Sequence, residues 1–128
     1  MKKVFRTRTF TRWMRKTGLT DGMLCQAVSE MMQGLVDGDL GGNLLKKRIG
    51  LLGRGKRGGG RTIVATNRRD RWFFLYGFEK NERANISKDE IKALRELAGQ
   101  YLAFDDKQIE WAVRSGKFME VNDDDNKA

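Results

Sequence analysis

The sequence predicts an α+β domain in which helices cover a small antiparallel sheet. The chain has 128 residues, 39% of them hydrophobic, which is enough for one modest core. Its hydrophobic patterns follow the order strand, helix, helix, strand, strand, strand, helix, and three consecutive strands favour a meander. We therefore expect a single domain over residues 1–121, with an extra C-terminal helical extension from about residue 103, and an acidic flexible tail over residues 122–128.

The first third of the chain predicts one strand and two helices. Residues 2–7 are β-branched and aromatic at their centre, which favours a strand. A short helix ended by Gly18 is predicted by the apolar spacing of Phe10, Trp13 and Met14. Thr20 is a suitable N-cap for a longer helix, whose apolar stripe consists of Leu24, Val28, Met31 and Leu35. The short helix also carries cations that fit a solvated face better than an RNA contact: Arg8, Arg12, Arg15 and Lys16.

A turn and the first strand of the meander come next. Residues 37–43 are rich in Gly, Asp and Asn, which predicts a turn. Residues 44–51 then favour a strand. Side chains alternate along a strand, so Lys46 and Arg48 share one face and can act on one ligand together.

The other two strands of the meander differ in character. Residues 61–66 favour a strand that follows a glycine-rich segment. Residues 71–78 are apolar on nearly every position, which predicts a central strand covered on both faces. Most of its aromatic side chains are therefore expected in the core, and only Tyr76 or Phe78 near its end to reach a nucleotide base.

The last part of the chain predicts two helices. Ser87 and Glu90 form a capping box at the start of the first one. Its apolar face consists of Ile91, Leu94, Leu97, Ala98, Tyr101 and Leu102. Asp105 or Asp106 is expected to cap the final helix, which ends near Gly116.

Positive charge is concentrated in two blocks of the sequence. The net charge is +9. Residues 1–16 carry seven Lys or Arg and no acid, and residues 44–83 carry twelve against three acids. The rest of the chain is net acidic. Such a distribution is typical of a protein surface that meets phosphate groups.

Several site types are excluded by composition. Histidine is absent, which rules out a His-based catalytic triad, and a structural zinc site is not expected beside one cysteine. No carboxylate cluster suggests a catalytic Mg²⁺. Cys25 lies on an apolar helical face and is expected to be a buried thiol. With one cysteine, no signal peptide and no apolar run long enough to span a membrane, the expected location is the cytoplasm.

The segment over residues 53–60 has two interpretations. It contains five glycines interleaved with Arg54, Lys56 and Arg57. Glycines let a backbone approach an anion closely, so the segment could be a loop that steers phosphates. It could equally be a mobile hairpin loop made soluble by charge. It is not a Walker A loop, because neither its spacing nor a following Ser or Thr fits.

Two motifs, together with the order of elements, resemble a known family. They are Lys-Arg-Gly-Gly-Gly-Arg at residues 56–61 and Tyr-Gly-Phe-Glu-Lys-Asn-Glu at residues 76–82. The chain resembles toxins of bacterial type II toxin–antitoxin systems, in the RelE/HigB branch of the RelE/ParE superfamily, over residues 1–102. The resemblance implies a microbial RNase type of fold, no cofactor, and an mRNA interferase that inhibits translation. Its expected partners are mRNA in the A site of the 70S ribosome and a cognate antitoxin, often a helix-turn-helix protein.

The resemblance also implies roles for individual residues. The residues matched to catalytic cations of the family are Lys46, Arg48, Arg61 and Lys80. The residues expected to bind RNA or phosphate are Lys47, Arg54, Lys56, Arg57, Tyr76 and Arg83. The chain departs from some relatives at Asn81, where they carry arginine, and it has Ile86 and Ser87 near the place of their C-terminal tyrosine. The general base is therefore left open.

Chemistry without a metal is consistent with these residues. The 2′-hydroxyl of RNA can attack the adjacent phosphate if a base, an acid and cations on the intermediate are present. Guanidiniums suit the last role, and a lysine crowded by cations, Lys46 or Lys80, can exchange a proton near neutrality. The alternatives are a ParE-like toxin that inhibits gyrase and a non-catalytic RNA-binding relative. The concentration of cations favours RNA cleavage over gyrase inhibition.

Overall fold

The computed structural model describes residues 2–51 and 55–122, and for residues 55–58 it describes the backbone alone. Four helices and six strands form the described part. In chain order they are β1 (Lys3–Thr7), α1 (Arg8–Met14), α2 (Asp21–Met32), β2 (Gly38–Gly41), β3 (Leu44–Leu51), β4 (Gly55–Thr66), β5 (Arg71–Glu79), α3 (Lys88–Leu102), α4 (Asp106–Arg114) and β6 (Phe118–Glu120).

All six strands form one sheet in the order β2-β3-β4-β5-β1-β6. The antiparallel meander predicted over β3, β4 and β5 is confirmed. β1 pairs in parallel with β5, and β6 pairs antiparallel with β1. The N-terminal strand therefore lies inside the sheet, and the predicted α+β class is correct.

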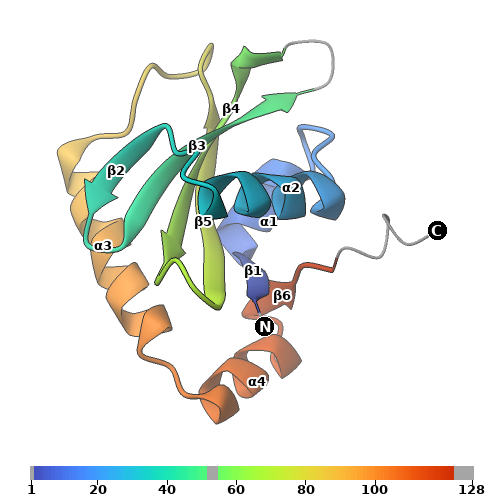
Figure 1. Ribbon diagram of the computed structural model, residues 1–128, viewed down its shortest axis with the longest axis vertical. Helices are drawn as coiled ribbons and strands as arrows, with labels where there is room; N and C mark the ends of the chain where they lie inside the picture. Colours follow the sequence, from blue (N-terminus) through green and yellow to red (C-terminus); the bar gives the residue numbers. More distant parts are fainter. Residues whose placement is uncertain (1, 52–54, 123–128) are drawn as a thin grey trace.

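Two hydrophobic clusters cover opposite faces of this sheet. On one face, Trp72 and Phe74 of β5 pack with α1 and α2. On the other face, Phe73 and Leu75 pack with α3 and α4. α1 and α2 lie on one side of the sheet and α3 on the other, as Figure 1 shows. β5 is thus buried on both faces, as its apolar sequence predicted.

The predicted helix starts are confirmed by cap geometry. The Thr20 side chain accepts a hydrogen bond from the Met23 amide. Ser87 and Glu90 form the expected capping box, and Asp105 caps α4. α1 starts at Arg8, capped by Thr7, because that threonine ends β1 in an extended conformation. The burial predicted for Cys25 is also confirmed.

Two predictions of local structure were wrong, and one strand was missed. Residues 38–41, predicted as part of a turn, form β2, which pairs with β3 through Gly38 and Lys46. β6 was not predicted at all. The glycine segment was expected to be a loop, yet β4 already begins at Gly55 and pairs with β3 at Leu51 and Ile49. In each case pairing with a strand distant in sequence stabilises residues whose own β-propensity is low.

Glycine within β4 and β5 has a packing reason. A Cβ atom on Gly60 would lie 2.7 Å from the ring of Trp13, and one on Gly77 would lie 2.2 Å from it. The indole of α1 therefore packs directly on the backbone of the two strands.

Among the described residues, no helix is long and apolar enough to cross a membrane. Asn122 is the one described residue of the predicted acidic tail.

Candidate functional site

Six residues on neighbouring strands form a patch on the sheet face that carries α3. We call this set the basic-aromatic patch: Lys46 and Arg48 of β3, Arg61 and Ile63 of β4, and Tyr76 and Phe78 of β5. The strand register arranges them in two rows. Neighbouring strands lie about 4.8 Å apart, so each row spans roughly 10 Å. Long side chains from the outer strands can therefore meet over the middle strand.

The first row consists of Lys46, Ile63 and Tyr76, and the second of Arg48, Arg61 and Phe78. As the alternation of the strand predicted, Lys46 and Arg48 share a face, and the intervening Lys47 is on the other. The register adds Arg61 directly beside Arg48, which no local pattern could show.

Two arginines face each other across neighbouring strands in the second row. Arg61 is only 5% exposed, and its Nη1 donates to the Gly59 carbonyl oxygen over 3.3 Å. Burial, followed by repulsion from Arg48, lowers the pKa of Arg61, and Asp37 partly opposes this effect. Among the described residues, the buried Nε of Arg48 has no hydrogen-bond partner. Paired like charges on a sheet face are destabilising, so an anion bound between them would be favourable.

One acidic side chain, that of Asp37, lies close to the two arginines. A carboxylate oxygen of Asp37 accepts a hydrogen bond of 2.7 Å from the backbone amide of Arg48. Lys46 lies against β2, where a Cβ on Gly38 would be 3.4 Å from its Cε. Within the described ranges, no acidic side chain forms an ion pair with Lys46 or Arg48. The open end of the patch therefore keeps its positive charge.

The aromatic side of the patch is held by a clamp from α3. Arg83 donates to both carboxylate oxygens of Glu90, over 2.8 and 2.5 Å, and its Nη1 donates to the Tyr76 hydroxyl over 3.2 Å. The same guanidinium lies 5.7 Å from the centre of the Phe78 ring. The hydrogen bond with Arg83 holds the pKa of Glu90 at about 2, and Glu90 raises the pKa of Arg83. The Tyr76 hydroxyl accepts one hydrogen bond here and can still donate its proton.

The remaining predicted site residues divide into three groups. Lys47 is 3% exposed, and its Nζ bonds to Glu30 at 2.7 Å and to the Leu35 carbonyl. Lys47 was expected to contact phosphate. Its position on β3 faces α2 instead, so its ammonium group is buried and already paired. Lys80 is exposed in the turn that follows β5. Outside the described residues lie Arg54 and the side chains of Lys56 and Arg57.

Three functional neighbours were not identified from the sequence. Glu90 was expected only as a capping residue, and its second role depends on the turn that brings Arg83 to α3. Asp37 was assigned to a turn. Trp13 was assigned to the core, and it supports the strands behind the patch. The glycine at position 77 in an apolar strand was the one signal for this close approach.

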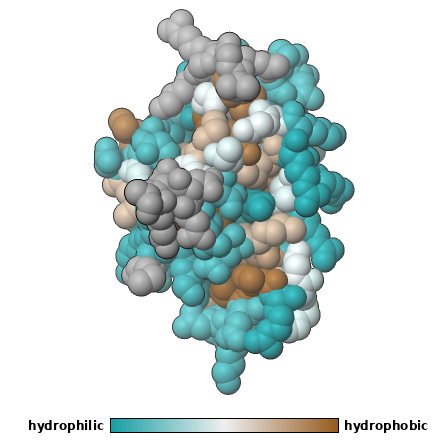
Figure 2. Space-filling view, turned by 90° about the vertical axis from the view of Figure 1, so that its right-hand side faces the viewer, coloured by the Kyte–Doolittle hydropathy of each residue, from teal (hydrophilic) through white to brown (hydrophobic). Residues whose placement is uncertain are grey.

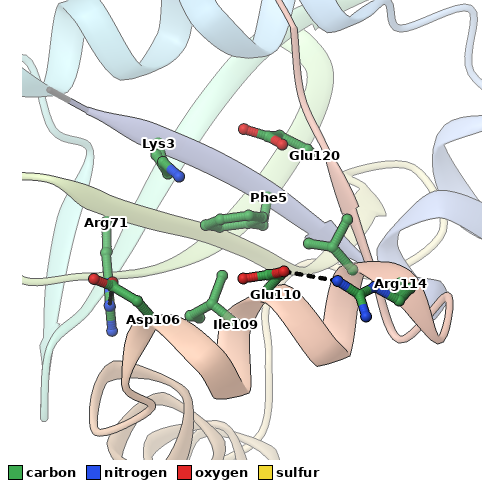
Figure 3. A pocket seen from close by; sticks show the side chains of 9 residues that line it. Lys3, Phe5, Arg71, Asp106, Ile109, Glu110, Arg114 and Glu120 are labelled. Atoms are coloured by element: carbon green, nitrogen blue, oxygen red, sulfur yellow. Dashed lines mark hydrogen bonds and ion pairs between the residues drawn. The ribbon is translucent and has the colours of Figure 1, made fainter.

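A cavity of about 660 Å³ lies elsewhere, between α4 and the strands β1 and β6. Figure 3 shows Phe5 and Ile109 on its walls and charged groups at its rim. Arg71 is already paired with Asp106 at 2.9 Å, and Arg114 with Glu110 at 2.7 Å. These internal pairs leave little net charge, so this cavity is a poorer site for a polyanion than the basic-aromatic patch.

Acidic and cysteine side chains do not gather as metal ligands in the described ranges, where no group of three or more occurs. A comparison with curated proteins finds no match for the sequence. A family model described as the RelE toxin of the RelE/RelB toxin–antitoxin system matches residues 2–121. Because this match spans nearly the whole chain, the protein belongs to the RelE family of toxins from toxin–antitoxin systems.

Proposed function

We propose that this toxin is an endoribonuclease that cleaves mRNA on the ribosome without a metal ion and thereby inhibits translation. The observation that supports this most is the pairing of Arg48 with Arg61 at the centre of the basic-aromatic patch. Two adjacent arginines with low exposure suit a phosphate that gains negative charge during the reaction.

The reaction follows from the chemistry of RNA. The 2′-oxygen forms a bond to the adjacent phosphorus, the bond from phosphorus to the 5′-oxygen breaks, and a 2′,3′-cyclic phosphate and a 5′-hydroxyl result. The proton of the 2′-hydroxyl goes to a base, and an acid supplies a proton to the 5′-oxygen. Arg48 and Arg61 would stabilise the intermediate with five oxygens on phosphorus.

Proton transfer falls to the first row and the adjoining turn. Lys46 lies in the first row with Ile63 and Tyr76, and its ammonium group has no acidic partner among the described residues. Lys80, exposed at the end of β5, is the other lysine that can take this role. Arg83 donates a hydrogen bond to the Tyr76 hydroxyl oxygen and holds it in place. The hydroxyl proton therefore stays available for donation to a phosphate oxygen. Arg83 itself acts by holding Tyr76 rather than by binding RNA.

The wider biological setting completes the proposal. The family implies an antitoxin that neutralises the toxin. The two motifs at residues 56–61 and 76–82 favour the HigB-like branch, and therefore a helix-turn-helix antitoxin, with the cytoplasm as the site of action. A ParE-like gyrase inhibitor and a non-catalytic RNA binder are the alternatives. Neither requires two guanidiniums paired across strands beside an ordered tyrosine hydroxyl.

One experiment separates these functions. Wild type, Arg48→Ala and a control, Lys92→Ala on the exposed surface of α3, are expressed briefly in bacteria, and new 5′ ends in cellular RNA are mapped. We expect cuts within mRNA, in register with codons, that persist in the Lys92 variant and disappear in the Arg48 variant. Growth arrest with double-strand DNA breaks and intact mRNA would instead identify a gyrase inhibitor. Absence of toxicity would identify a non-catalytic relative.

A further inference from the structure

Three arginines of the N-terminal segment surround one hollow outside the basic-aromatic patch. Arg8, Arg12 and Arg15 follow each other at spacings of four and three residues, so they share one side of α1 and its C-cap. Together with Thr11 and Met119 they line a hollow of about 360 Å³. All three arginines are exposed.

The walls of this hollow are fixed by contacts from the end of the chain. Arg8 Nε donates to the Gly116 carbonyl over 2.9 Å, which ties α1 to the segment after α4. The Thr11 hydroxyl donates to the Met119 sulfur over 3.3 Å, which ties it to β6. Arg8, Thr11 and Met119 are therefore fixed by packed elements, and the exposed Arg12 and Arg15 line the hollow from α1 and its C-cap.

No anion within the described part of the chain neutralises its charge. Arg12 and Arg15 have no acidic partner among the residues placed by the structure. Like charges spaced by four residues destabilise a helix by a few tenths of a kcal/mol. Figure 2 shows hydrophilic residues over much of one molecular face, around a central column of more apolar ones. An external anion is the partner that this charge arrangement lacks.

The hollow belongs to the opposite side of the sheet from the candidate active site. Trp13, between Arg12 and Arg15 in the chain, packs on Gly60 and Gly77 from the α1 side. Arg61 and Phe78, the next residues along those strands, face α3 instead. One RNA strand lying across the patch therefore does not also fill this hollow.

We propose that Arg8, Arg12 and Arg15 form a second RNA-binding site, which takes the phosphate backbone of a structured RNA separate from the strand that is cut. The choice of RNA rests on the proposed function. Guanidiniums bind phosphate oxygens through paired hydrogen bonds, and the three arginines extend over about 10 Å of helix, which suits a ligand with regularly repeated charges. An acidic peptide is the competing ligand, but its carboxylates lack a fixed spacing.

The test uses a variant that removes charge without touching the packing. Arg12→Gln/Arg15→Gln leaves Arg8 in place, because Arg8 holds the end of α4. The matched control is Lys92→Gln/Lys107→Gln, which removes the same charge from exposed positions of α3 and α4. The probe is a fluorescein-labelled RNA hairpin with 2′-O-methyl riboses, which cannot be cleaved through its 2′-oxygens. Its Kd is measured by anisotropy over a range of salt concentrations.

We expect the arginine variant to bind the hairpin about tenfold more weakly than the control, with a salt-dependence slope reduced by about two. The double variant Arg12→Lys/Arg15→Lys should recover part of the affinity. Equal Kd values for the arginine variant and the control would refute the second site. A loss of affinity for an Asp-rich peptide, with unchanged affinity for the hairpin, would also refute it.

Cleavage kinetics on ribosomes distinguish this inference from the proposed function. The arginine variant should raise KM for ribosome-bound mRNA and leave kcat unchanged. Arg48→Ala should lower kcat instead. In an Arg48→Ala background, Arg12→Gln/Arg15→Gln should still weaken hairpin binding by the same factor. If the wild-type protein cuts no mRNA, the proposed function fails. The hairpin measurement needs no cleavage and still decides whether the second site exists.

Discussion

Substituting Gly77 by alanine should destabilise the protein by inserting a methyl group against Trp13. The new Cβ would lie 2.2 Å from Cε3, 2.4 Å from Cζ3 and 2.7 Å from Cδ2 of the indole, whereas ordinary contacts start at 3.4 Å. The two groups must therefore separate by more than 1 Å. The indole cannot simply rotate away, because its ring also packs against Phe10 at a centroid distance of 5.5 Å.

The magnitude follows from two opposing effects. Overpacking of this kind costs about 1–3 kcal/mol, and the severity of the overlap favours the upper end. Alanine in a strand recovers roughly 0.5–1 kcal/mol relative to glycine, since the unfolded chain has less freedom. The net loss in the free energy of unfolding should therefore be about 2 kcal/mol. Urea denaturation measures it directly.

A double-mutant cycle tests the reasoning. Trp13→Ala should be destabilising by itself, and adding Gly77→Ala to it should then be neutral or slightly stabilising, because the overlap has gone. If the losses from Trp13→Ala and Gly77→Ala simply add, the indole contact is not the cause. Gly77 pairs with Thr62, next to the pairing of Arg61 with Phe78, so cleavage activity should also fall more in Gly77→Ala than in an equally destabilised variant elsewhere.

Three further outcomes are expected. The pKa of Glu90 is about 2 in the folded state and about 4.3 in the unfolded state. Its pairing with Arg83 therefore stabilises the protein above pH 4–5, and this stabilisation is lost as the pH falls toward 2. Glu90→Gln should flatten this part of an acid-unfolding curve. Glu30→Ala, which leaves the buried Lys47 without its carboxylate, should cost up to about 3 kcal/mol in thermal or urea unfolding, and unchanged stability would contradict the ion pair. Tyr76→Phe should lower kcat for RNA cleavage about tenfold or more without changing Tm appreciably, and an unaltered kcat would remove the hydroxyl from the mechanism.

Local signals in the sequence were sufficient for most of the fold. Helix starts depend on a few adjacent residues, so the caps at Thr20, Ser87 and Asp105 could be identified directly. The buried β5 could be recognised because both of its faces are apolar. β2 and β6 could not, because three or four residues of weak propensity become strands only through partners distant in sequence.

The candidate site was predictable only within one strand. Alternation placed Lys46 and Arg48 together, but the pairing of Arg48 with Arg61 depends on the register between β3 and β4. The same limitation explains the two residues whose expected role changed. Lys47 was grouped with its basic neighbours although it faces α2, and Arg83 was treated as a phosphate ligand although the turn after β5 brings it to Glu90.

The two basic sites share one structural support, and this determines which variants should affect both. Trp13 packs on the strand backbones that carry Arg61 and Phe78 on their other face, while its chain neighbours Arg12 and Arg15 line the second hollow. A variant that displaces the indole therefore shifts the patch and moves α1 relative to β6. Arg48→Ala and Arg12→Gln/Arg15→Gln remove charge without moving this support, so each should impair one site only. Loss of both activities in Gly77→Ala, beside selective losses in the charge variants, is the pattern that this architecture requires.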